Sequence, residues 1–137
     1  ALRQAEALRV VDDQRGAPTG APFIADATAL VVARYLANGR DGFPFGLYHL
    51  AAAGAASWHE YACFIAGQAR RAGLPVNLRP EDIQPVSSAL YPAAARRPPN
   101  SCLDTRRLAR VFGIHAPPWQ DGVVHALAAL AGSRGPE

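Results

Sequence analysis

The fold is organised around the stretch Arg96-Arg97-Pro98-Pro99-Asn100-Ser101-Cys102-Leu103-Asp104. Proline fixes φ and removes a backbone donor, so the segment that follows Arg97 is expected to be extended and stiff. A guanidinium on such a segment keeps its charge at any working pH, and its planar fork matches phosphate oxygens. Asn100 and Ser101 add hydrogen-bonding groups, and Asp104 is predicted to cap the next helix. The plainer interpretation is a solvated arginine pair before a capped helix, because exposed charges usually contribute little.

A second polar loop with a constrained backbone lies far upstream, at Asp12-Asp13-Gln14-Arg15-Gly16-Ala17-Pro18-Thr19. Gly16 and Pro18 punctuate it, as is typical of loops. Asp12 and Asp13 could form an acid–base pair, but neighbouring residues of a strand point to opposite faces, so they are not expected to share a proton. We therefore expect loops 12–19 and 94–101 to present polar groups from a rigid backbone.

Strands and helices alternate around these loops, which predicts the α/β class. Apolar residues recur at helical spacing after Pro22, and Asn38-Gly39 is a good stop for that helix. Ser57-Trp58-His59-Glu60 has the pattern of a capping box at the start of another helix. Trp58 and Trp119, each beside a helix start, are interpreted as packing anchors rather than as stacking surfaces. Strands are predicted at residues 8–12, 47–51, 76–78 and 83–86, and helices at 23–37, 58–72, 105–112 and 119–130.

The composition fits one folded part of a larger protein. The chain has 137 residues, of which 50% are apolar and 18% charged, as in globular proteins. It contains no Met and opens on a sequence typical of the end of a helix, and four strands are too few for a doubly wound sheet with its own covering helices. We therefore expect a fragment whose N-terminal part is missing. Residues 132–137 are predicted to be a frayed tail.

Charge and cysteine usage limit the partners that the sequence predicts. The net charge is +3, and the arginines are scattered without interleaved aromatic residues, so nucleic acid is not a predicted partner. No apolar run approaches the roughly 20 residues of a membrane span, so no membrane partner is predicted. Cys63 and Cys102 lack metal-type spacing and are interpreted as reduced residues of a cytoplasmic protein.

Several kinds of chemistry find no support in the sequence. The histidines lack the spacing of metal ligands, so no metal site is predicted. There is no Gly-x-Ser-x-Gly turn, and Cys63 lies on an apolar helix face that disfavours a thiolate. No Gly-x-Gly-x-x-Gly loop follows a strand, so the chain brings no dinucleotide cradle of its own. No catalytic or cofactor-binding residue is therefore assigned.

Four stretches, taken in order, resemble one known family. They are the run from Val10 to Gly20, Gly46-Leu47-Tyr48-His49-Leu50, Ser57-Trp58-His59-Glu60-Tyr61-Ala62, and the run from Tyr91 to Asp104. Together they look like the C-terminal half of the dTDP-4-dehydrorhamnose reductase family, within the extended short-chain dehydrogenase/reductases. The resemblance covers nearly the whole chain. Two of its motifs are specific for the family when they occur in the same chain: Asp-Gln-x-Gly-x-Pro-Thr and Arg-Arg-Pro-x-Asn-Ser-x-Leu-Asp.

The resemblance implies that the parent protein reduces dTDP-4-dehydro-L-rhamnose to dTDP-L-rhamnose by hydride transfer from NADPH or NADH. The family's catalytic pair is a Tyr and a Lys four residues later, and this chain has no Lys. Residues 1–137 are therefore expected to be the C-terminal sugar-nucleotide-binding lobe of a Rossmann-type fold, inactive when alone. The missing N-terminal half would bind the cofactor, and Mg²⁺ is a further candidate cofactor of the parent. The implied partners are a dTDP-sugar and, as a candidate, a second copy in a homodimer.

The family's substrate-binding positions are carried over residue by residue. Those expected to bind the sugar nucleotide are Gln14, Arg15, Pro18, Thr19, Arg96, Arg97, Asn100 and Ser101. Arg97, with Arg96 beside it, falls where the family places a diphosphate-binding arginine. Asn100 and Ser101 are as consistent with ordering the loop as with contacting the ligand. Two alternatives stay open: a non-catalytic regulatory subunit, and a stand-alone nucleotide-binding module derived from the same family.

Overall fold

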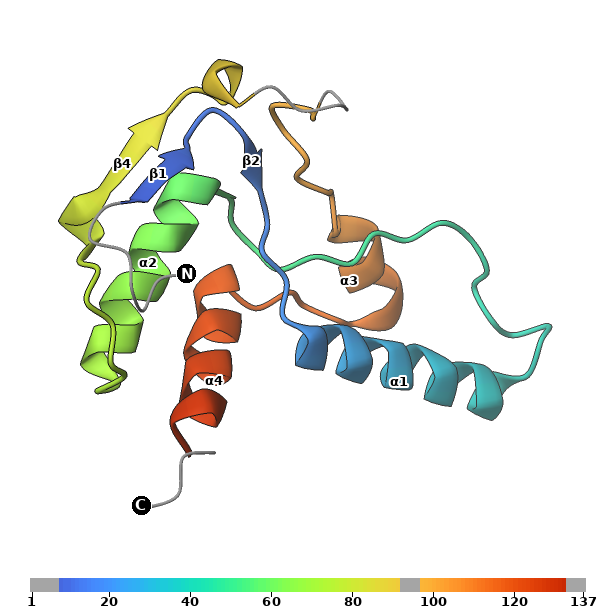
Figure 1. The fold of residues 1–137 in the computed structure, drawn as a ribbon. Coiled ribbons are helices and arrows are strands. Elements are labelled where there is room, and N and C mark those ends of the chain that lie inside the picture. The colour runs from blue at the N-terminus through green and yellow to red at the C-terminus, as the bar shows by residue number, and fades with distance from the viewer. Residues whose placement is uncertain (1–7, 92–96, 133–137) are drawn as a thin grey trace.

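A computed structural model describes residues 8–91 and 97–132 of the chain. Within these residues, helices and two small sheets are joined by long extended segments (Figure 1). The predicted α/β class is confirmed. The elements in order are β1 (Leu8–Val11), β2 (Arg15–Gly16), α1 (Ala21–Asn38), β3 (Ala56–Ser57), α2 (Trp58–Arg71), β4 (Ile83–Val86), α3 (Arg106–Phe112) and α4 (Trp119–Gly132), with 3-10 turns at Pro80–Asp82 and Ser88–Leu90.

The strands β1 and β4 form a parallel pair, in register from Leu8 opposite Ile83 to Val11 opposite Val86. Helix α2 lies along this pair and covers one of its faces (Figure 1). Ala66 of α2 packs there with Leu78 and Ile83, and Leu78 is fully buried. Burying these side chains on one helix holds together two strands that are far apart in sequence. The predictions of strands at 8–12 and 83–86 are confirmed to within a residue.

Helix α2 begins at the capping box that the sequence predicts. The Ser57 hydroxyl accepts a hydrogen bond from the Glu60 N–H at 3.0 Å, and the Glu60 carboxylate accepts one from the Ser57 N–H at 2.8 Å. These two bonds satisfy backbone donors that an uncapped helix would leave free. The helix therefore starts at a fixed residue, and the side chains of its first turn project from a rigid base.

Trp119, the first residue of α4, packs α4 against α2. Its indole is only 6% exposed, and it meets the rings of Tyr61 and Phe64 edge-on at centroid distances of 5.7 and 5.0 Å. Gly54 passes close by with φ +85°, and a Cβ added there would lie 3.2 Å from the indole, so only glycine suits this position. The prediction that Trp119 is a packing anchor is confirmed.

Helix α1 is long and mostly uncovered by the described part of the chain. Ala27 is its buried residue, packed with Leu108 and Ile114, and the Arg34 guanidinium donates to the Val111 carbonyl at 2.7 Å. Leu36 is 75% exposed, and the C-terminal part of α1 extends beyond α3 (Figure 1). No helix within the described residues combines the length and apolar character needed to cross a membrane.

Two predicted strands are wrong within the described residues. Residues 47–51 are extended but pair with no other strand, and Leu47 is 73% exposed, whereas the prediction made it part of a buried strand. The Arg107 guanidinium instead holds this segment, lying 4.7 Å from the Tyr48 ring centroid and donating to the Leu47 carbonyl at 3.1 Å. Residues 76–78 run beside α2 and form no strand. Apolar sequence makes a strand only where another strand supplies the ladder.

The cap of α3 also differs in detail from the prediction. The N-cap position is Thr105, one residue later than expected, and its side chain makes no capping bond. Asp104 still serves the helix start, because its carboxylate accepts from the Arg106 backbone N–H at 2.9 Å and pairs with the Arg106 guanidinium at 2.6 Å. This pairing holds the pKa of Asp104 well below its usual range. Most of the predicted frayed tail lies outside the described residues.

Candidate functional site

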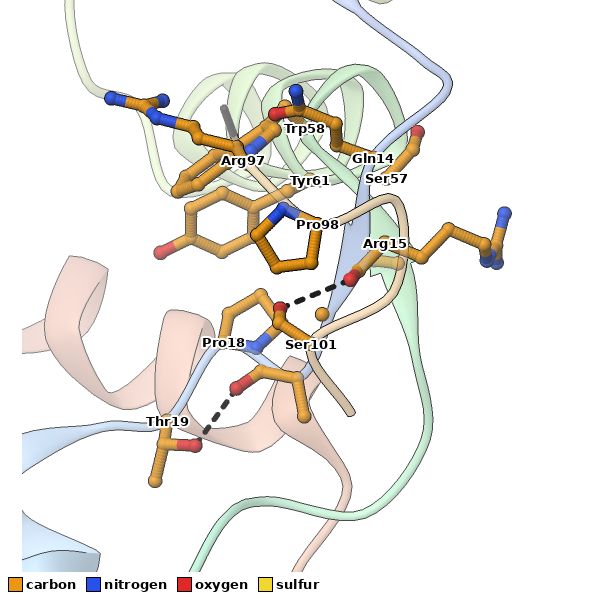
Figure 2. A pocket seen from close by; sticks show the side chains of 13 residues that line it. Gln14, Arg15, Pro18, Thr19, Ser57, Trp58, Tyr61, Arg97, Pro98 and Ser101 are labelled. Atoms are coloured by element: carbon orange, nitrogen blue, oxygen red, sulfur yellow. Dashed lines mark hydrogen bonds between the residues drawn. The ribbon is translucent and has the colours of Figure 1, made fainter. Parts of the chain in front are cut away.

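The described residues enclose a pocket of about 390 Å³ where the two polar loops meet the start of α2 (Figure 2). This volume is at the lower end of the range for small-molecule sites, roughly 300–1,000 Å³. Loops that are separated by most of the chain thus share one cavity. Its lining residues are Gln14, Arg15, Gly16, Ala17, Pro18, Thr19, Ala56, Ser57, Trp58, Tyr61, Arg97, Pro98 and Ser101.

Backbone hydrogen bonds join the two loops through β2. Arg15 donates its N–H to the Pro99 carbonyl at 2.8 Å, and its own carbonyl accepts from the Ser101 N–H at 2.9 Å. On its other side β2 pairs antiparallel with β3, so Arg15 lies opposite Ser57. A Cβ added to Gly16 would lie 2.8 Å from the Ser101 hydroxyl, which shows how closely the loops approach. The sequence predicts two rigid loops, and the structure fastens one to the other.

The end of β1 is tied to α2 by the Asp12 carboxylate. The buried Ser57 hydroxyl donates to it, and the His59 ring nitrogen Nδ1 lies 3.8 Å away. The other nitrogen of the ring, Nε2, lies 2.9 Å from the Ile83 carbonyl of β4. Burial, together with the charge of Asp12, raises the pKa of the neighbouring Cys63 thiol. Cys63 is therefore a protonated packing residue here, as the sequence predicts.

Asp13 faces a different set of partners from Asp12. Its carboxylate accepts a hydrogen bond from the Ser87 hydroxyl at 2.8 Å and from the Ser88 N–H at 3.0 Å. These bonds lower the pKa of Asp13, with the Ser87 hydroxyl as the main cause. The two neighbouring carboxylates thus fasten different segments, in agreement with the expectation that they do not act as an acid–base pair.

Arg15 lines the pocket, but its guanidinium is held by another part of the chain. Its guanidinium lies on the far side from the aromatic rings in Figure 2, where it pairs with the Glu60 carboxylate at 3.1 Å. The Thr19 hydroxyl is also already hydrogen-bonded within the chain: it donates to the Ala17 carbonyl at 2.9 Å and accepts from the Ala52 N–H at 3.0 Å. Ligand contacts by either residue stay predictions.

Asn100 and Ser101 both order their own loop. The Asn100 side-chain oxygen accepts from the Cys102 N–H at 2.9 Å, which is a local turn motif. The Ser101 hydroxyl donates to the Arg15 carbonyl at 3.1 Å, at the wall of the pocket. The sequence leaves two roles open for these residues, ordering the loop and contacting the ligand, and these hydrogen bonds support the first. A ligand contact stays a prediction for both residues.

Arg97 and Gln14 differ from the residues above. Within the part of the chain that the structure describes, neither the Arg97 guanidinium nor the Gln14 amide has a hydrogen-bond or ion-pair partner, and both residues line the pocket. Pro98 follows Arg97 and contributes its ring to the same wall (Figure 2). Pro18 also lines the cavity, as expected for a site residue. Arg96 lies outside the described residues.

The sequence reasoning missed two aromatic residues of the pocket, Trp58 and Tyr61. The interpretation of Trp58 as a packing anchor is wrong, because its side chain is 52% exposed. Trp58 is the first residue of α2, where Cβ vectors tilt back toward the N-terminus, and residues three apart are neighbours on a helix surface. That spacing, read together with the capping box, could have placed both rings beside the loop.

The described residues offer no ready site for a metal or a dinucleotide. No three His, Cys, Asp or Glu side chains among them gather closely enough to hold a metal ion, so Mg²⁺ finds no donor set in this part of the chain. The turn that follows β1 contains two carboxylates that are already bonded to serines, where a dinucleotide loop would need bare glycine backbone.

Comparisons with known proteins agree with one another. The family model described as RmlD substrate binding domain matches residues 1–131. The dTDP-4-dehydrorhamnose reductase of Shigella flexneri is 43% identical over 93% of this chain, and that of Escherichia coli K12 is 41% identical over the same share. In both cases the match covers 41% of the relative, so the chain spans about two fifths of the length of these curated relatives.

Solved structures show the same partial coverage. The dTDP-4-dehydrorhamnose reductase of Bacillus anthracis, solved in complex with NADP, aligns with a TM-score of 0.73 at 27% identity and covers 93% of this chain and 40% of its own. The enzyme of Clostridium acetobutylicum aligns with a TM-score of 0.76 at 23% identity, over 93% of this chain and 40% of its own. At 23% identity, the similarity to the Clostridium acetobutylicum structure shows a shared fold only.

Proposed function

Because the chain belongs to the RmlD substrate binding domain family, homologous to dTDP-4-dehydrorhamnose reductases, we propose that its pocket binds the dTDP-sugar of such an enzyme. One observation carries the proposal: Arg97 lines the cavity with a guanidinium that has no partner among the described residues. A diphosphate supplies the anion that this cation lacks. The Arg-Pro-Pro backbone holds the cation in place without help from its side chain.

The lobe would serve the reaction by positioning. Hydride transfer requires that the sugar carbonyl be held close to the nicotinamide, and binding energy from the distant diphosphate can provide that placement. The chain has no Lys, so the family's Tyr–Lys pair would have to come from elsewhere, together with the residues that bind NADPH or NADH. We therefore expect the chain by itself to leave NADPH unoxidised in the presence of dTDP-4-dehydro-L-rhamnose. A homodimer stays a prediction.

Calorimetric titration of dTDP into the chain tests this proposal through Arg97. A charge-assisted bidentate contact is worth about 1.5–3 kcal/mol, so Arg97→Ala should weaken binding roughly ten- to a hundredfold. Arg97→Lys keeps the charge but loses the planar fork, and should recover only part of the affinity. The melting temperature should stay nearly constant, because the Arg97 guanidinium has no hydrogen bond or ion pair within the described residues.

Arg79→Ala is the matched control. Arg79 is an exposed arginine that does not line the pocket, so its removal lowers the net charge by the same amount without altering the site. If Arg97→Ala and Arg79→Ala bind dTDP equally well, the effect of Arg97 is one of general charge and the proposal is wrong. A fall of many degrees in the melting temperature of Arg97→Ala would make Arg97 a structural residue instead.

A further inference from the structure

We propose that Trp58 is the residue on which the thymine ring of the bound nucleotide stacks, an inference that rests on the proposed function. The two tryptophans of the chain are placed in opposite ways. Trp119 is buried and meets two aromatic rings, whereas Trp58 is 52% exposed and meets no other aromatic ring within the described residues. A large apolar ring that is left half in water beside a cavity is available to a ligand.

The base that carries Trp58 is rigid. The capping box between Ser57 and Glu60 fixes the first turn of α2, and Ser57 is bonded on its other side to Asp12 at the end of β1. A ring on the first helical residue therefore projects from a backbone that is held by two separate elements. Binding a flat ligand on such a ring requires little ordering, so more of the stacking energy appears as affinity.

Tyr61 extends the aromatic wall behind Trp58. It lies one turn further along α2, lines the same pocket, and is backed by Trp119 at a centroid distance of 5.7 Å. In Figure 2 the rings of Trp58 and Tyr61 lie on the same side of the cavity as Arg97, with Pro98 beside them. The cavity thus combines a flat aromatic wall with an unpaired cation. A flat π-system joined to an anion is the chemistry of a nucleoside diphosphate.

The competing occupant of the aromatic wall is the sugar of the same ligand. A hexose presents C–H groups to an aromatic face but has no π-surface of its own. Stacking between a nucleobase and an aromatic side chain is the stronger general interaction, and it tolerates any base. Thymine is therefore the expected partner of Trp58, and the experiment below includes ligands that separate base, diphosphate and sugar.

The test compares dTDP, inorganic pyrophosphate and dTDP-L-rhamnose as titrants of the unmodified chain and of Trp58→Ala and Trp58→Phe. Trp58→Ala should weaken dTDP binding about five- to a hundredfold while leaving pyrophosphate binding within twofold. Trp58→Phe keeps an aromatic face and should recover most of the dTDP affinity. Both variants should fold, because the ring is half exposed in the unmodified chain.

Fluorescence provides a second measurement on the same samples. Stacking of thymine should quench the emission of Trp58, and dTDP should protect that emission from acrylamide. In Trp58→Phe the remaining tryptophan is the buried Trp119, so the quenching by dTDP should disappear although dTDP still binds. Pyrophosphate should not quench any of the proteins.

Each other outcome overturns a particular statement. If Trp58→Ala binds dTDP as tightly as the unmodified chain, Trp58 does not stack the base, while the proposed function stands. If Trp58→Ala weakens dTDP-L-rhamnose but not dTDP, the sugar occupies the ring and the assignment of the base is wrong. If the unmodified chain binds none of the three ligands, the proposed function fails and this inference fails with it.

Discussion

Two sets of side chains line the pocket or contact its lining residues, and they differ in whether other parts of the chain already bind them. The scaffold residues, Asp12, Thr19, Ser57, Ser101 and Trp119, are engaged by other parts of the chain. The open residues, Gln14, Trp58 and Arg97, line the cavity without such bonds among the described residues. Members of the two sets can be adjacent in sequence, as Ser57 and Trp58 are.

The difference follows from burial. A buried polar group that lacks a partner costs about 1–3 kcal/mol, so Ser57, at 1% exposure, has both a donor and an acceptor. Arg97 is exposed and can keep water as its partner until a ligand replaces it. Polar character alone therefore does not identify a binding residue. The useful question is which polar side chains the fold leaves unoccupied.

The largest expected effect is the loss of stability on removing Trp119, compared with removing Trp58. Trp119→Ala should lower the free energy of unfolding by about 3–5 kcal/mol, because it leaves a cavity between α2 and α4. Trp58→Ala should change it far less, since half of that ring is already in water. Urea unfolding followed by circular dichroism measures both. Equal losses of stability would remove the distinction between a scaffold ring and an open one.

The next effect concerns the buried cap. Ser57→Ala should destabilise the chain by about 0.5–2 kcal/mol, the usual cost of losing an N-cap side chain. Ser87→Ala is a matched control, because Ser87 is an exposed serine that also donates to an aspartate and caps a short helical turn. Its loss should cost less than that of Ser57, because water can replace the bonds of an exposed serine but not those of a buried one. If thermal unfolding shows the reverse order, burial is not what makes Ser57 a scaffold residue.

A smaller effect is expected from Arg15, which sequence reasoning assigns to the substrate. Arg15→Ala removes an ion pair whose two side chains are each 48% exposed, so stability should fall by about 1 kcal/mol or less. Its affinity for dTDP should remain within about twofold of the unmodified chain, because the guanidinium points away from the cavity. Calorimetry that finds a tenfold loss of affinity would move Arg15 to the open residues.

The smallest effect is a dependence of stability on acid pH. The pKa of Asp13 is lowered from 3.8, chiefly by the Ser87 hydroxyl and also by the Ser88 N–H. A lowered folded-state pKa contributes stability above the unfolded value, and this contribution disappears as pH falls through the folded pKa. The unfolding midpoints of the unmodified chain and Asp13→Asn should therefore differ at pH 6 and converge below pH 3.8. A difference that does not shrink as the pH falls below 3.8 would exclude the carboxylate as its source.

Sequence patterns predicted the local features of the fold. The Ser57–Glu60 capping box and the stop of α1 at Asn38-Gly39 depend on residues within a few positions of one another, and both are confirmed. The start of α3 was predicted one residue too early. The strand at 47–51 was wrong because strands need partners, which the apolar pattern does not reveal. For the site, the two loops were predicted. The sequence did not show that the Arg15 guanidinium is already paired, because its partner Glu60 lies 45 residues away.

The bonds that close the pocket have a consequence for folding kinetics. The contact between Ser101 and Arg15 joins residues 86 positions apart, so the entropy of closing that loop must be overcome before the bond provides any stabilisation. The capping box and the helices involve near neighbours and can form early. The cavity should therefore assemble among the last steps of folding and be among the first regions to open. Amide hydrogen exchange at Arg15 and Ser101 would then report on local opening of the pocket rather than on global unfolding.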